Sequence, residues 1–258
     1  MKTIPNSPRS DTFMTLGRIF VSVALVVFGI QHFLYAGFVA GLVPAWMPAR
    51  LFWAYFVGVA FFAAAVGIVI QRTMRPAGTL LGVTFFLFVA MLHIPRIVAH
   101  SRDGNEWTSG FVALAMCGGA WILASASPLD EREIADPFLR LGRYFFGLSM
   151  VAFGIQHFFD SRLTVRIGPP WILGRPLWAC VVGAVLIAAG GAILFGKKLR
   201  LAATILGTMI FLYSLLFYLP RIAAHPRDPG PWTSGFELLA LSGCALVLGT
   251  TRPSEARE

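Results

Sequence analysis

The segment LGRIFVSVALVVFGIQHF occupies residues 16–33, and LGRYFFGLSMVAFGIQHF occupies residues 141–158. Each segment has one arginine as its third residue, continues as an apolar run, and ends near a glutamine and a histidine. An α-helix needs about 20 residues to cross the hydrocarbon core of a bilayer, so each run is long enough to span it. A signal peptide does not explain the pattern, because the second copy lies in the middle of the chain. The two segments therefore predict one kind of membrane-spanning helix that occurs twice.

The composition extends this prediction to the whole chain. The 258 residues are 57% hydrophobic and 13% charged, and the mean hydropathy is +0.74, whereas a soluble domain carries charge at about a quarter of its positions. Backbone groups in lipid must form their hydrogen bonds locally, so the spans should be α-helices. We predict an all-α polytopic membrane protein with eight spans, near residues 17–34, 52–70, 77–97, 108–125, 142–159, 177–195, 201–222 and 233–250.

An internal repeat organises these spans. A shift of 125 residues aligns 16–124 with 141–249 without a gap, and 45 of the 109 aligned positions are identical. Each copy contains four apolar runs, and an even number returns the chain to the side from which it entered. The copies should therefore be parallel repeats, related by an axis along the membrane normal. We assign residues 1–124 to the first repeat, 125–140 to a connector and 141–258 to the second repeat.

The net charge of +9 is explained by membrane topology. The basic residues are scattered at the ends of apolar runs, without the clustered basic face and stacking platform of a nucleic-acid-binding protein. All three lysines, Lys2, Lys197 and Lys198, fall on the side that also holds both termini and the connector. Cytoplasmic loops carry an excess of lysine and arginine. We therefore predict a multi-pass protein of the cell membrane with both termini in the cytoplasm.

Ionisable residues gather at the opposite, outer ends of the spans. In HIPRIVAH, residues 93–100, the side chains of His93, Arg96 and His100 are spaced as one stripe of a helix. The second repeat has YLPRIAAH at residues 218–225. Pro95 and Pro220 each remove a backbone hydrogen bond and predict a kink. Ionisable residues within spans usually face the interior of the bundle, which favours a polar cavity here.

We predict a ligand-binding site at this outer face, with arginines as fixed charges and histidines as proton-exchanging groups. No catalytic residue is assigned. The candidate ligand-binding residues are His32, Trp46, His93, Arg96, His100, Trp107, His157, Trp171, Tyr218, Arg221, His225, Trp232 and Glu237.

Each candidate also has a purely structural interpretation. The arginines can extend to lipid head groups, and the tryptophans can form an aromatic belt. Thr108 or Ser109 can cap the fourth helix, as Thr233 or Ser234 can in the second repeat. These alternatives stay open from the sequence alone.

The two repeats differ at informative positions. His93 is replaced by Tyr218, Val112 by Glu237, and Glu106 by Pro231. Glu237 is the only acidic residue within a predicted span, and the sequence predicts Arg221 or His225 as its partner. Either one repeat holds the site, or one shared site is built from unlike halves.

A family resemblance follows from three motifs. GIQHF in the first helix, P-x-W in the outer loop (residues 44–46 and 169–171) and P-R in the third helix (95–96 and 220–221) resemble the DoxX-like membrane proteins. The resemblance covers nearly the whole chain as a tandem duplication and implies a four-helix unit. Some DoxX-like proteins are linked to quinone-coupled oxidation of thiosulfate outside the cytoplasm, so the resemblance implies quinone chemistry, but it transfers no catalytic set to particular positions.

Three functional classes remain. The first is a quinone-linked oxidoreductase or its membrane subunit, which binds quinone or a small anion and works with a redox partner protein, because the sequence contains no flavin or nicotinamide fingerprint. The second is a haem or metal protein, with His32 and His100, or His157 and His225, as ligand pairs; the scarcity of carboxylates argues against metal. The third is a non-catalytic carrier, lipid-binding protein or assembly factor, whose partner is membrane lipid.

Overall fold

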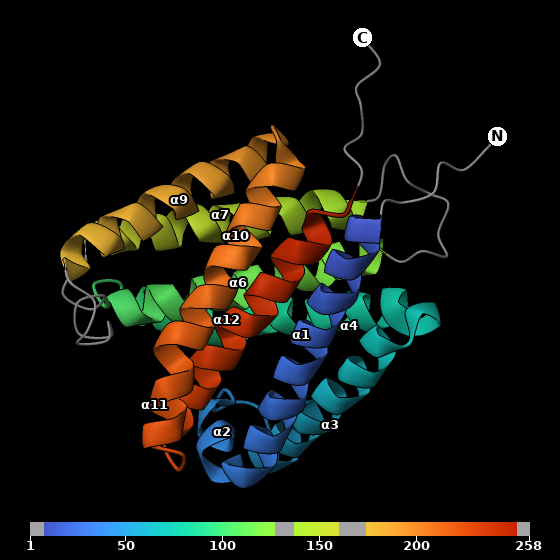
Figure 1. Ribbon diagram of the computed structural model, residues 1–258. Helices are drawn as coiled ribbons and strands as arrows, with labels where there is room; N and C mark the ends of the chain where they lie inside the picture. Colours follow the sequence, from blue (N-terminus) through green and yellow to red (C-terminus); the bar gives the residue numbers. More distant parts are fainter. Residues whose placement is uncertain (1–7, 127–136, 160–173, 252–258) are drawn as a thin grey trace.

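The computed structural model describes residues 8–126, 137–159 and 174–251, and every regular element in these ranges is helical. Figure 1 shows them in chain order. The elements are α1 (Pro8–Leu34), α2 (Ala36–Leu42), α3 (Arg50–Val69), η1 (Gln71–Thr73), α4 (Met74–Phe88), η2 (Val89–His93), α5 (Ile94–Ala99), α6 (Gly104–Ser125), α7 (Pro137–Phe159), α9 (Arg175–Phe195), α10 (Leu199–Tyr213), η3 (Ser214–Tyr218), α11 (Leu219–Ala224) and α12 (Pro229–Leu248).

Eight helical segments in these ranges are long and apolar enough to cross a membrane. They confirm the predicted all-α polytopic fold. The third span of each repeat is longer than predicted, since it covers Gln71–Ala99 in the first repeat and Leu199–Ala224 in the second. The start of α1 and the end of α12 lie at the same end of the molecule, and α2 and α11 lie at the opposite end (Figure 1).

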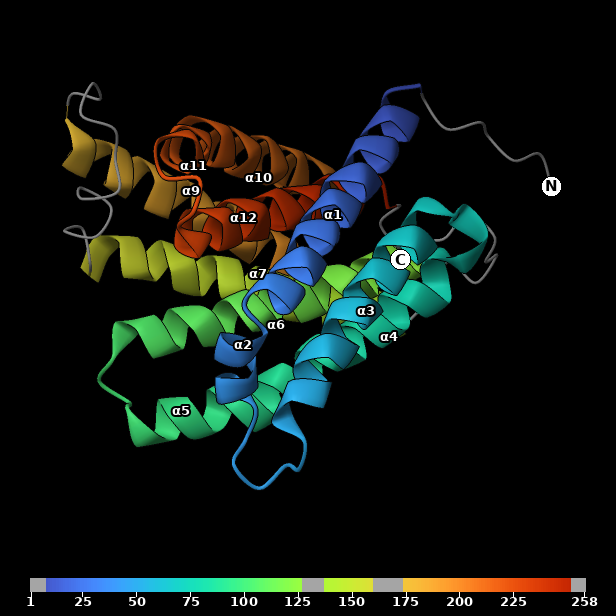
Figure 2. The same ribbon diagram turned by 90° about the horizontal axis from the view of Figure 1, so that it is seen from below.

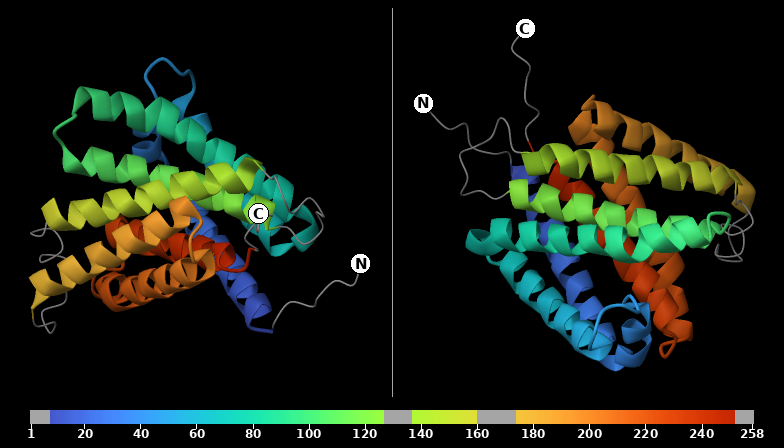
Figure 3. Two further views of the ribbon diagram at one scale, coloured as in Figure 1. Left: turned by 90° about the horizontal axis from the view of Figure 1, so that it is seen from above. Right: turned by 180° about the vertical axis from the view of Figure 1, so that it is seen from behind.

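The spans form a closed ring rather than two separate bundles. Helices pack in chain order within each repeat, α1 against α3, α3 against α4 and α4 against α6, and likewise from α7 to α12. The first helix of each repeat packs on the last helix of the other repeat, α1 on α12 and α7 on α6 (Figure 2). Helices α6 and α12 also touch each other. Figure 3 shows the pairing of α6 with α7 from two further directions. Each repeat is therefore completed by the other.

Two matching glycine pairs allow the close packing of α1 on α12 and of α7 on α6. A Cβ atom on Gly17 of α1 would lie 2.5 Å from the carbonyl oxygen of Gly243 in α12, and one on Gly142 of α7 would lie 2.7 Å from that of Gly118 in α6. The shift of 125 residues converts one pair into the other. Small residues let transmembrane helices approach closely, so any larger side chain at these positions would separate the repeats.

The repeated arginine of the LGR motif caps a neighbouring helix. Arg18 is 8% exposed, and its guanidinium donates hydrogen bonds to the carbonyl oxygens of Ile68, at 3.1 Å, and Val69. Arg143 donates in the same way to Ile193, at 3.2 Å. The last carbonyls of a helix lack partners within it and carry partial negative charge. Both arginines therefore stabilise the C-terminal end of the second span of their own repeat.

The predicted distortion at the prolines takes the form of a π-helical turn. Elements η2 and η3 directly precede the segments that contain Pro95 and Pro220, and the amide of Ile94 bonds to the carbonyl oxygen of Val89, five residues earlier. Proline has no N–H to donate, so the regular ladder is interrupted there and the turn widens. In the second repeat the hydroxyl of Ser214, within η3, donates to the carbonyl of Gly235 at 2.8 Å, which fixes this turn against α12.

Candidate functional site

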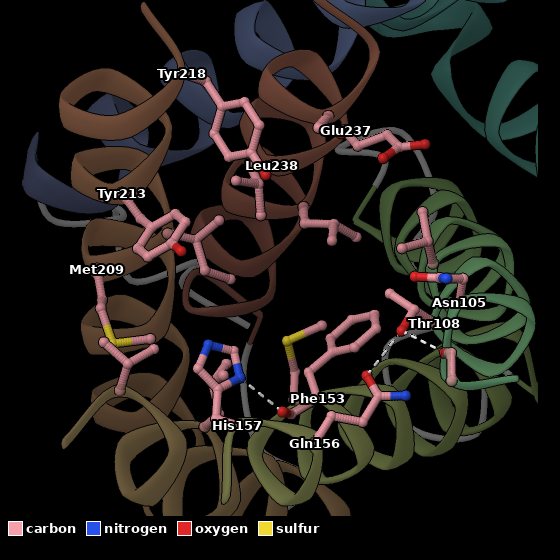
Figure 4. A pocket seen from close by; sticks show the side chains of 18 of the residues that line it. Asn105, Thr108, Phe153, Gln156, His157, Met209, Tyr213, Tyr218, Glu237 and Leu238 are labelled. Carbon is pink, nitrogen blue, oxygen red and sulfur yellow. Dashed lines mark hydrogen bonds between the residues drawn. The ribbon is translucent and has the colours of Figure 1, made fainter. Parts of the chain in front are cut away.

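A cavity of about 550 Å³ lies in the second repeat, among α7, α9, α10, η3 and α12, with the first turns of α6 on one side (Figure 4). Most of its wall is apolar and includes Met150, Phe153, Val182, Leu186, Ile210 and Leu241. Its polar side chains are Asn105, Thr108, Gln156, His157, Tyr213, Tyr218, Ser234 and Glu237. Because α6 belongs to the first repeat, both repeats contribute to this one cavity.

His157 enters the cavity from α7 with a defined orientation. Its Nδ1 lies 2.8 Å from the carbonyl oxygen of Phe153, one turn earlier in the same helix. A carbonyl only accepts, so Nδ1 carries the proton, and in the neutral imidazole Nε2 keeps its lone pair. Figure 4 shows the second ring nitrogen pointing away from this bond, toward the side of the cavity where Tyr213 lies. His157 therefore presents a hydrogen-bond acceptor to the cavity.

Glu237 enters from α12 across the cavity from His157 (Figure 4). Within the part of the chain that the structure describes, its carboxyl group has no hydrogen bond and no ion pair. The sequence predicted Arg221 or His225 as its partner, and the structure shows no pairing with either of them. A carboxylate in apolar surroundings is costly unless something pairs with it. No described residue therefore competes with a ligand for the carboxyl group of Glu237.

Two tyrosines form the wall between these groups. Tyr213 stacks on Phe217 with ring centroids 4.2 Å apart, and Tyr218 lies at the end of η3, where the first repeat has His93. The sequence analysis missed Tyr213. The signal was present, since the equivalent residue in the first repeat is Phe88 and the change adds one hydroxyl group to a lipid-spanning helix.

Gln156 connects the cavity to the first repeat. The hydroxyl of Thr108 in α6 lies 3.2 Å from the amide oxygen of Gln156 and donates to it, with the carbonyl of Gly104 as its alternative acceptor at 2.9 Å. Sequence reasoning had noted the repeated glutamine without assigning it to the site. Thr108 therefore joins two helices and is not the N-cap that one structural interpretation suggested. The N-caps are Asp103 and Asp228, whose carboxylates accept from the amides of Asn105 and Gly230.

The matching region of the first repeat is filled by aromatic rings. Phe61 and Phe85 replace Leu186 and Ile210, are nearly fully buried, and lie with ring centroids 5.8 Å apart. His32 has the same bond as His157, from Nδ1 to the carbonyl of Phe28 at 2.8 Å, but the ring of Phe61 lies edge-on to its imidazole at 5.1 Å. The two repeats thus share a histidine geometry and differ in the space around it.

The two outer arginines also differ. Arg96 donates two hydrogen bonds to the carboxylate of Glu106, from Nε at 2.9 Å and from Nη2 at 2.7 Å. In the second repeat the equivalent of Glu106 is Pro231, so the exposed Arg221 lacks this partner. Neither guanidinium lines the cavity. Among the described residues, the charge at this position is therefore paired in the first repeat and has no such carboxylate partner in the second.

His93 and His100 do not lie on one continuous helical stripe, because the helix ends before His100. His93 lies in η2, and its Nδ1 is buried without a hydrogen-bond partner among the described residues. His100 and His225 follow the last residues of α5 and α11 as exposed C-caps. His225 does not line the cavity that His157 lines. In the described part of the chain, no group of three or more His, Cys, Asp or Glu residues is placed to hold a metal ion.

The three candidate tryptophans that the structure describes do not line the cavity. Trp107 and Trp232 donate from Nε1 to the carbonyls of Ser101, at 2.9 Å, and Pro226, at 3.1 Å, and so fix the turns before α6 and α12. Trp46 is exposed in the loop after α2. Trp171 lies outside the described residues. Of the thirteen predicted residues, the structure brings together His157, Tyr218 and Glu237 on this cavity.

Comparison with known proteins adds one similarity. Residues 21–123 match a family described as a domain of unknown function (DUF8561). The matched segment lies within the first repeat and covers less than half of the chain. Neither the curated proteins nor the solved structures include a match.

Proposed function

We propose that this integral membrane protein binds an isoprenoid quinone in the second-repeat cavity and serves as a quinone-linked oxidoreductase or as the membrane subunit of one. One observation carries the proposal. A cavity within the spans combines an apolar wall with polar groups on opposite sides, His157 on α7 and Glu237 on α12. A quinone ring has that chemistry, with an apolar body and two oxygens at opposite ends.

The size and wall of the cavity support an apolar ligand. Small-molecule sites usually have volumes of about 300–1,000 Å³ and mainly hydrophobic walls with a few placed polar groups. The volume of about 550 Å³ falls in this range. Met150, Phe153 and Leu186 supply flat and flexible apolar contacts for a ring and the start of its chain.

The charge at the predicted outer end of the molecule favours a small anion as the electron donor. Arg221 and Arg227 are exposed there in the second repeat, and positive surface charge attracts anions to a site. The resemblance to DoxX-like proteins adds thiosulfate as an example of such an anion. Electrons from another source would reach the quinone through a redox partner protein.

The test is direct extraction of ligand from the purified protein. Lipid extraction and mass spectrometry should find quinone with the wild-type protein and not with the double variant Leu186→Phe/Ile210→Phe. These two phenylalanines are the residues that the first repeat has at the equivalent positions, Phe61 and Phe85, so the fold has a precedent for them. The control is Leu212→Phe, which makes the same change at an exposed position of α10. Absence of quinone from the wild-type protein, together with no binding of added quinone, would reject the proposal.

A haem-binding function is the second candidate, because His157 directs an unprotonated Nε2 into the cavity. An absorption spectrum of the same preparation separates the two, since bound haem gives an intense band near the ultraviolet edge of the visible range that the variant His157→Gln would lose. A carrier or assembly function would instead be indicated by an ordinary lipid in the extract.

A further inference from the structure

We infer that the cavity selects a ligand with two hydrogen-bond donors, and hence the reduced dihydroxy form of a quinone over its oxidised dicarbonyl form. The inference rests on the proposed function and adds the redox state of the ligand that binds. It follows from the polar groups that protein contacts leave free in the cavity. Two of these groups, from α7 and α12, offer acceptors on opposite sides.

The first acceptor is Nε2 of His157. Its partner nitrogen, Nδ1, is engaged with the carbonyl of Phe153 at 2.8 Å, so the imidazole cannot turn its N–H toward the cavity without losing that hydrogen bond. A ligand hydroxyl can donate to Nε2, whereas a ligand carbonyl would meet it lone pair to lone pair. The histidine therefore favours a ligand O–H at this end.

The second acceptor is the carboxyl group of Glu237. It has no hydrogen-bond donor among the described residues, and the equivalent residue of the first repeat is Val112, which also lines this cavity. An ionised carboxylate only accepts, so a ligand hydroxyl satisfies it and a ligand carbonyl does not, whereas a protonated carboxyl group can also donate to a carbonyl. The selection at this end therefore belongs to the ionised form. The second repeat therefore places a carboxyl group on the cavity wall where the first repeat has an apolar side chain.

The two tyrosines can hold the ligand without selecting its redox state. The hydroxyls of Tyr213 and Tyr218 can donate or accept, so they serve a hydroxyl and a carbonyl equally. The amide oxygen of Gln156 is the acceptor for Thr108, which leaves its N–H groups as donors that suit a carbonyl. The acceptors that favour a ligand hydroxyl are therefore His157 and Glu237.

The experiment compares two redox forms of one probe. Wild-type protein in lipid nanodiscs is titrated calorimetrically, without oxygen, with decylubiquinol and with decylubiquinone. We expect the reduced probe to bind roughly tenfold more tightly at a pH where Glu237 is ionised, because each hydroxyl then donates a hydrogen bond that a carbonyl cannot form. The variant Glu237→Val removes one acceptor and introduces the first repeat's residue, and should lower the ratio by weakening the reduced probe alone, leaving the part of the preference that His157 supplies. The variant His157→Gln serves as a second test, because its amide N–H can donate to a carbonyl and should shift the preference toward the oxidised probe.

Each outcome has a distinct meaning. If both probes bind and the oxidised one binds as tightly or more tightly in the wild type, the selection of the reduced form is overturned and quinone binding stands. If neither probe binds, the proposed function itself fails. An equal loss of both probes in either variant would show that the residue shapes the cavity rather than distinguishes the two forms, which contradicts the inference.

Discussion

The hydroxyl of Thr108 in α6 donates a hydrogen bond to the amide oxygen of Gln156 in α7 at 3.2 Å. The equivalent hydrogen bond joins the hydroxyl of Thr233 in α12 to the amide oxygen of Gln31 in α1, also at 3.2 Å. Both bonds join different repeats. The GIQHF motif (residues 29–33 and 154–158) and the WTSGF sequence (residues 107–111 and 232–236) therefore meet across the boundary between the repeats, and one of the two contacts lies beside the cavity.

The contact between Thr108 and Gln156 should be energetically coupled. We expect Thr108→Val to lower the free energy of unfolding by about 1 kcal/mol, because the amide oxygen of Gln156 loses its inter-helical donor. A double-mutant cycle with Gln156→Leu, measured by chemical unfolding in detergent, isolates the pairwise energy. The control is Thr84→Val, since the hydroxyl of Thr84 bonds only within its own helix, to Leu80 at 2.9 Å. Strictly additive effects of the two substitutions would show that the bond contributes nothing.

The spans and the repeat were predictable because they depend on composition and on identity between the copies. The apolar runs fixed the number of spans, and the prolines at 95 and 220 located the distortion of the third span, although its π-helical form also depends on contacts such as that of Ser214 with Gly235. The pairing of α1 with α12 was not predictable. Both copies contain the same interacting motifs, so pairing within a repeat and pairing between repeats agree equally well with the sequence.

The position of the cavity depends on a difference that the sequence shows only weakly. Leu186 and Phe61 are both apolar residues of a membrane span, and only their packing shows that Phe61 covers an imidazole. His157 and Glu237 were identified because ionisable residues in spans are rare. Arg96 was identified for the same reason, but its ion pair requires Glu106 to fold back from the start of α6, which a helix-by-helix prediction does not place.

The orientation in the membrane remains a prediction from the distribution of lysines. In a Cys180→Ser background, single cysteines at Asp103 and Asp228 should react with a membrane-impermeant maleimide added to intact cells, and a cysteine at Arg132 in the connector should react only after permeabilisation. Cys180 is removed because it is exposed in the native protein. Labelling at Arg132 alone in intact cells would reverse the orientation and place the outer ends of the spans in the cytoplasm.

The outer arginines give a test of where the ligand binds. Arg96→Lys and Arg221→Lys should both leave quinone affinity unchanged, because neither guanidinium lines the cavity. Arg96→Lys should also make stability more sensitive to salt, since lysine cannot form the two parallel bonds that Arg96 makes to Glu106. Titration with a quinone and thermal unfolding at low and high ionic strength measure the two effects. A tenfold or larger loss of affinity in Arg96→Lys would instead place the ligand in the first repeat, as the histidine and arginine stripe originally indicated.

The difference in packing between the repeats predicts that placing each repeat's side chains at the equivalent positions of the other lowers stability by unequal amounts. Phe61→Leu/Phe85→Ile should lower the free energy of unfolding by roughly 2–4 kcal/mol, because it removes buried ring atoms from a filled region and leaves a void. The reciprocal change, Leu186→Phe/Ile210→Phe, should cost less than about 1 kcal/mol, because the added atoms enter the existing cavity instead of displacing packed neighbours. Chemical unfolding of both double variants in the same detergent measures the difference. Equal destabilisation by the two exchanges would show that the regions around His32 and His157 are equally filled, and it would remove the basis for assigning the ligand to the second repeat.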